Sequence, residues 1–64
     1  GYEAEKALWQ GRLLLARADI QARGSNLAGA GKTATQAAEA LQGILGPHAA
    51  EVHLAALIGH LPAQ

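Results

Sequence analysis

The sequence predicts an all-α fold: a three-helix antiparallel unit, made of a helical hairpin plus a third helix and completed by oligomerisation or by a partner. Two stretches carry small and apolar residues at alternating steps of three and four, the spacing of one stripe along an α-helix. The first set is Ala4, Leu8, Gly11, Leu15, Ala18 and Ala22, and the second is Leu27, Ala30, Ala34, Ala37, Leu41 and Ile44. No segment alternates apolar and polar residues as a half-buried strand does.

The first helix is expected at about residues 2–23. Acidic residues gather near its start and basic residues near its end, which suits the helix dipole. Asp19 and Arg23 are spaced for a favourable i,i+4 ion pair. Gly24 follows and is expected to end the helix in a left-handed conformation.

The second helix is expected at about residues 27–45. Ser25 and Asn26 are both good N-cap residues for it. Two glycines weaken its first turns by roughly 1 kcal/mol each relative to Ala, so a Gly-rich loop with a helix starting near Lys32 is the alternative. The early start is favoured because Leu27 lies in phase with the later stripe.

The third helix is expected at about residues 47–61. Gly46 suits the end of the preceding helix, and Pro47 suits the first position of the next one. Short linkers predict that consecutive helices pack antiparallel. The apolar stripe of this helix is predicted to consist of Ala50, Leu54, Leu57, Ile58 and Leu61.

The composition indicates a thin hydrophobic core. The chain has 64 residues, so residues 1–64 form a single helical domain or a fragment of one. Ala dominates the apolar residues, Trp9 and Tyr2 are the only aromatics, and no Cys is present to form a stabilising disulfide. We therefore expect the chain to bury further apolar surface by oligomerisation, or to be excised from a longer repeat protein.

Charge and hydropathy argue against two classes of partner. The formal net charge is zero and the five basic residues are scattered, so no basic stripe is available to bind nucleic acid. No apolar run is long enough to span a bilayer.

The chain does not begin with Met, which predicts a processed product or an excised fragment. The absence of Cys is compatible with any cellular compartment.

The first helix carries a second apolar stripe, nearly opposite the first. Trp9, Leu13, Ala16 and Ile20 form it with steps of 4, 3 and 4. A helix with two apolar stripes needs partners on two sides. We interpret these four residues as a partner interface; the alternative is that the other two helices flank the first and cover both stripes.

Catalysis has little support in the sequence. The segment 29–33 resembles the tail of a phosphate-binding loop, but the first Gly of that pattern would have to stand at Asn26 and no strand precedes it. We therefore interpret it as a capped helix start. No carboxylate pair has a useful helical spacing, and Ser25 is best explained as a cap. No catalytic residue, cofactor or enzyme activity is predicted.

Three histidines, His48, His53 and His60, are expected in the third helix. His53 and His60 share a face but are separated by about 10 Å along the axis, too far for one metal ion within a single helix. A metal site would require a second chain. Solvent-facing or interface histidines are the favoured interpretation, and no metal site is predicted.

One stretch resembles a known repeat. The run from Leu14 to Ala18 followed by Gly24 is similar to the first helix and inter-helix glycine of a tetratricopeptide-type hairpin, and Ala30, Ala34 and Ala37 are similar to its packing positions. The residues Leu13–Leu41 thus resemble one degenerate hairpin of that family. The resemblance implies protein–protein binding by stacked helices, without catalysis.

The leading functional hypothesis is a non-catalytic protein–protein interaction or oligomerisation module that presents an apolar helix stripe. Its partner is another protein or a second copy of the chain. One alternative is a membrane-active or secreted small helical peptide. Another is an oligomeric carrier of a metal or small molecule that uses the histidines of the third helix.

Overall fold

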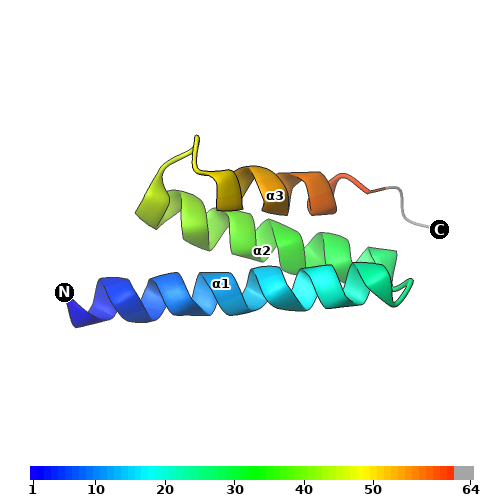
Figure 1. Ribbon diagram of the computed structural model, residues 1–64, viewed down its shortest axis with the longest axis horizontal. Coiled ribbons are helices and arrows are strands. Elements are labelled where there is room, and N and C mark those ends of the chain that lie inside the picture. The colour runs from blue at the N-terminus through cyan, green and yellow to red at the C-terminus, as the bar shows by residue number, and fades with distance from the viewer. Residues whose placement is uncertain (62–64) are drawn as a thin grey trace.

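The computed structural model describes residues 1–61, and its described part consists of three α-helices (Figure 1). Helix α1 spans Tyr2–Arg23, α2 spans Leu27–Leu45 and α3 spans Ala50–Gly59. The helices run antiparallel in chain order, and α2 lies between α1 and α3 in the view of Figure 1. The predicted all-α, three-helix unit is confirmed.

Small residues bring α1 and α2 close together. Ala30, Ala34, Ala37 and Leu41 of α2 are completely buried, which matches the stripe that their spacing predicts. On α1 the residue opposite Leu41 is Gly11, where an added Cβ would lie 2.8 Å from Leu41 Cδ2. Since real carbon atoms do not approach that closely, a side chain at residue 11 would force either the Leu41 side chain or the two helices to shift.

The turn after α1 is a Schellman motif. The Asn26 N–H donates to the carbonyl of Gln21 at 2.8 Å, and the Ser25 N–H donates to the carbonyl of Ala22 at 3.2 Å. Ser25 has a φ of 68°, whereas Gly24 has a φ of −86°. The prediction that Gly24 is left-handed is therefore wrong by one residue, because the two hydrogen bonds place the left-handed position at Ser25.

The early start of α2 follows from its cap. The side-chain oxygen of Asn26 accepts a hydrogen bond from the Gly29 N–H at 3.1 Å, which satisfies one of the free donors of the first turn. The helix begins at Leu27, as the stripe predicts, and the alternative of a Gly-rich loop up to Lys32 is excluded.

Helix α3 is shorter than the predicted span of 47–61. The chain leaves α2 through Gly46, whose φ of 87° favours glycine, and Pro47 lies in a turn instead of the first helical position. Ala49 is the extended N-cap, and the helix ends at Gly59. Residues 47–49 belong to the turn that reverses the chain direction, and residues 60–61 lie beyond the end of the helix, so neither stretch is helical.

The buried face of α3 also differs from the prediction. Val52, Ala55 and Ile58 are buried, whereas the other large residues of the predicted stripe, Leu54, Leu57 and Leu61, are exposed. Ile58 joins a core cluster to which all three helices contribute; its members are Ala18, Ala30, Ala34 and Ile58, with Leu15 and Ala22 packed against them. The helix is apolar on nearly every side, so periodicity alone does not select the face that packs.

Candidate interaction surface

The second stripe of α1 faces solvent. Trp9 is 63% exposed, Leu13 67% and Ile20 70%, and Ala16 between them is also exposed. Helices α2 and α3 do not cover this face, which excludes the alternative that they cover both stripes of α1. Tyr2 extends the same exposed face toward the N-terminus. The four predicted residues thus lie together as one apolar surface on a single helix.

An ion pair between α1 and α3 borders this surface. Arg12 donates from Nε to Glu51 Oε2 at 2.9 Å and from Nη2 to Oε1 at 3.2 Å, a bidentate arrangement. The hydrogen bonds to the Arg12 guanidinium lower the pKa of the Glu51 carboxyl, and the same bonds raise the pKa of Arg12. The pair holds α3 beside α1 although the two helices are far apart in sequence.

The same arginine also contacts the stripe. The guanidinium carbon of Arg12 lies 5.6 Å from the centroid of the Trp9 ring, within the range of a cation–π interaction. Glu51 therefore orients Arg12, and Arg12 in turn supports the Trp9 ring. The most bulky residue of the stripe is thus linked through Arg12 to the ion pair between α1 and α3.

A groove between α1 and α3 runs along this border. Its lining residues are Arg12, Leu15, Ala16, Asp19, Arg23, Glu51 and Leu54. Ala16 belongs both to the stripe and to the groove, and Leu54 of α3, which is 49% exposed, lines the groove with it. The apolar surface therefore continues from α1 onto α3.

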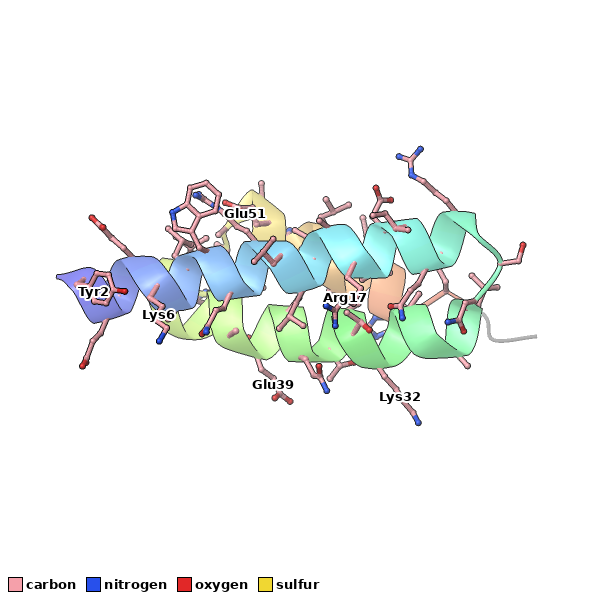
Figure 2. The ribbon with its side chains drawn as sticks, turned by 90° about the horizontal axis from the view of Figure 1, so that it is seen from below. Tyr2, Lys6, Arg17, Lys32, Glu39 and Glu51 are labelled. Atoms are coloured by element: carbon pink, nitrogen blue, oxygen red, sulfur yellow. The ribbon has the colours of Figure 1, made fainter. Side chains whose placement is uncertain are left out.

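Charged residues delimit the surface on both sides. On the groove side, the predicted pair of Asp19 and Arg23 is confirmed, with Arg23 Nε 3.1 Å from each carboxylate oxygen. Figure 2 shows Lys6 and Arg17 along the other side of α1, and Glu51 beyond the groove side. An apolar strip with polar borders is the usual anatomy of a binding patch.

The segment that resembles a phosphate-binding loop is the start of a helix. Residues 29–33 lie in the first turns of α2, where Gly29 is bonded to the Asn26 cap. Thr33 is buried, and Lys32 points into solvent away from α1 (Figure 2). The interpretation as a capped helix start is confirmed.

The histidines occupy three different settings. His48 lies in the turn before α3, His53 lies in α3 and His60 directly follows it, so the prediction that all three are helical is wrong for the outer two. His60 Nδ1 is 2.6 Å from the carbonyl of Ala56. His53 and His60 line one open hollow with Leu57. Within residues 1–61 no group of three or more His, Cys, Asp or Glu side chains could hold a metal ion.

Sequence reasoning missed two members of this surface, Leu54 and the Arg12–Glu51 pair. The sequence predicts Leu54 in the packed stripe of the third helix, and its exposure follows from the actual rotation of α3. The ion pair joins residues that are 39 positions apart, and helical periodicity carries no signal for such a contact.

None of the helices within residues 1–61 combines the length and the apolar character needed to cross a membrane. Comparisons with protein-family models, with curated proteins and with solved structures find no match to this chain.

Proposed function

We propose that the chain is a non-catalytic interaction module that binds a protein partner, or its own copies, through the exposed stripe of α1. The observation that carries the proposal is the exposure of Trp9, Leu13 and Ile20 by about two thirds on one face of one helix. Single exposed apolar residues are ordinary, but a contiguous apolar patch with a polar rim is typical of a binding surface. The tetratricopeptide-like resemblance implies the same kind of function.

The energetics of this stripe are compatible with association. Full burial of a large apolar side chain contributes roughly 1.5–3 kcal/mol, so covering the remaining two thirds of one contributes about 1–2 kcal/mol. The three large residues together supply about 3–6 kcal/mol, and a symmetric pair of stripes supplies about twice that. Association costs roughly 4–15 kcal/mol before contacts are counted, so a single stripe reaches only the lower end of this cost, whereas two matching stripes exceed its lower end.

The test compares association with folding in the same variants. Trp9→Ala and Leu13→Ala remove side chains that are exposed in the single chain, so they should weaken association while changing the free energy of unfolding by roughly 0.5 kcal/mol or less. Leu41→Ala is the matched core control, and it should cost about 2–5 kcal/mol of stability. Sedimentation equilibrium measures the first effect, and urea unfolding of dilute chain measures the second. Equal losses of unfolding free energy in all three variants would mean that the stripe is internal core.

A photoreactive diazirine amino acid in place of Leu13 identifies what covers the stripe. Adducts with a protein, abolished by Ile20→Asp but not by the α2 surface control Gln36→Asp, support the proposal. The absence of any protein adduct would overturn it. Lipid vesicles that shift the fluorescence of Trp9 would favour a membrane-active peptide instead, and saturable heat on titration with zinc or copper would favour a carrier.

A further inference from the structure

We propose that the partner of the α1 stripe is a second copy of this chain, docked antiparallel about a two-fold axis that passes between Leu13 and Ala16. This inference rests on the proposed function and names its partner. It is carried by three observations: the order of large and small residues along the stripe, the charges along its groove-side border, and the position of Leu54.

The stripe is complementary to itself in the antiparallel direction. Its steps of 4, 3 and 4 are the same from either end, so an axis midway between residues 13 and 16 pairs residues whose numbers sum to 29. Leu13 then faces Ala16 of the second copy, and Trp9 faces its Ile20. Large residues thus meet smaller ones, as close packing requires. A parallel pair would place two Trp9 rings together and leave a gap between two copies of Ala16.

The border charges agree with this direction. In an antiparallel pair whose axis stands perpendicular to the plane of the two helices, each border faces the same border of the other copy. The groove-side border of α1 carries Glu5, Arg12, Asp19 and Arg23. Antiparallel docking brings Glu5 to Arg23 of the second copy with an axial offset of about 1.5 Å, and Arg12 to Asp19 with an offset of about 3 Å. Parallel docking, whose two-fold axis runs along the helices, would instead bring this border against the opposite border of the second copy, which carries Glu3, Lys6, Gln10, Arg17 and Gln21.

The side chain of Arg23 is available for this contact. It is 79% exposed although it also bonds to Asp19, so the guanidinium retains free donors for a second carboxylate. Glu5 is exposed as well. Each dimer would contain the Glu5–Arg23 contact twice because of the two-fold symmetry.

Leu54 lies where the axis would pass. It lines the groove with Leu15 and Ala16, so it lies at the level of α1 where the two-fold axis is placed. We call the line along which the two α1 stripes meet the seam. Because the axis keeps each border on its own side, the α3 helices of both copies lie on one side of this seam. The two Leu54 side chains then approach each other above Leu13 and Ala16, and they cover that side of the seam.

The first experiment is a charge exchange followed by sedimentation equilibrium of the 64-residue chain. Glu5→Arg and Arg23→Glu each create two like-charge contacts per dimer and should weaken dimerisation by about two- to tenfold. The double variant restores both contacts and should bind more tightly than either single variant, short of the wild type only by the lost bond between Arg23 and Asp19. Arg23→Gln is the control for loss of the bond to Asp19. Failure of the double variant to recover beyond either single variant would overturn the antiparallel pairing.

The second experiment measures the helix direction. The chain has no Cys, so Glu3→Cys provides one position for a spin label. Antiparallel docking about the proposed axis separates the two labels by about 35 Å along the helices, whereas parallel docking leaves them side by side. Electron spin resonance distances near the shorter value would overturn the proposal. Unchanged sedimentation of the labelled chain shows that the label does not disturb the seam.

The failures of the two proposals are distinguishable. A chain that stays monomeric well above tens of micromolar, yet forms a diazirine adduct with a different protein, overturns the second copy and leaves the interaction module intact. A monomer without any protein adduct overturns both. If the Leu13→Asp variant has normal helicity and an unchanged dimer dissociation constant, both proposals are overturned as well, because the seam would then lie elsewhere.

Discussion

Replacing Gly11 with Ala tests whether a missing side chain sets the distance between α1 and α2. The new Cβ would lie 2.8 Å from Leu41 Cδ2 and 2.9 Å from Leu41 Cγ. Leu41 is completely buried, so its side chain has no solvent-filled space to move into. Overpacking of this kind costs roughly 1–3 kcal/mol, while the higher helix propensity of Ala returns about 1 kcal/mol. We expect Gly11→Ala to lower the free energy of unfolding by up to about 2 kcal/mol.

Gly43→Ala is the matched control for this substitution. Gly43 lies within α2, and a Cβ there would meet no atom within 4 Å. It should therefore stabilise the chain by up to about 1 kcal/mol through helix propensity alone. Urea unfolding followed by far-ultraviolet circular dichroism measures both variants, at a concentration where the chain is monomeric. The reasoning is refuted if the two substitutions stabilise the chain equally.

A double-mutant comparison identifies the atoms responsible. In a Gly43→Ala background, Leu41→Ala removes the side-chain atoms that the Gly11→Ala methyl would meet. There the Gly11→Ala change should become stabilising by about 1 kcal/mol, since only the propensity gain remains. If it still destabilises the chain, the close contact lies between other atoms than those of Leu41.

Three further substitutions test local features. Ser25→Gly should stabilise the chain by about 0.5 kcal/mol in thermal melts, because Gly adopts the left-handed φ of 68° without strain; a loss of stability would contradict this. Asn26→Ala should cost about 1 kcal/mol, or roughly 4–8 °C in the melting temperature, through loss of the hydrogen bond from Gly29. Glu51→Gln should reduce the loss of unfolding free energy that acid causes. Arg12 lowers the pKa of Glu51 from its ordinary value of 4.5. The contribution of Glu51 to stability is therefore complete above about pH 4.5 and disappears as the pH falls through the lowered pKa. If urea unfolding gives the variant and the wild type the same loss of unfolding free energy in acid, the pair does not stabilise the fold.

The packing of α1 against α2 could be predicted from sequence because its signal is local and strongly periodic. Both helices begin and end where the residue pattern and the capping residues indicate, at Tyr2–Arg23 and Leu27–Leu45. Small residues at steps of three and four permit close approach only on one face, so the pattern also predicts which face is buried. The exposed stripe of α1 was found in the same way, because polar strips separate it from the packed face.

The orientation of α3 could not be predicted by the same reasoning. A helix that is apolar on most sides offers several faces for burial, and the choice depends on the shape of the surface it meets. The Ala-rich side of α2 accepts Val52, Ala55 and Ile58, while the longer Leu54 and Leu57 stay outside. Such a choice depends on volumes summed across two helices, which no single-helix pattern contains. The left-handed Ser25 likewise depends on the hydrogen bonds of the turn and not on residue preference alone.

The unexpected orientation of α3 gives this helix a part in the surface on α1. Its buried face completes the core through Ile58, and the same rotation brings Glu51 to Arg12 and Leu54 to the groove beside Ala16. If the helix had packed through its larger leucines, neither contact would exist, and the stripe of α1 would end at the edge of a single helix. The apolar surface is therefore a product of the tertiary fold. A peptide of α1 alone would retain the four stripe residues and Arg12 but lack Glu51, which orients Arg12, and Leu54, which extends the surface, so we expect it to associate more weakly than the complete chain.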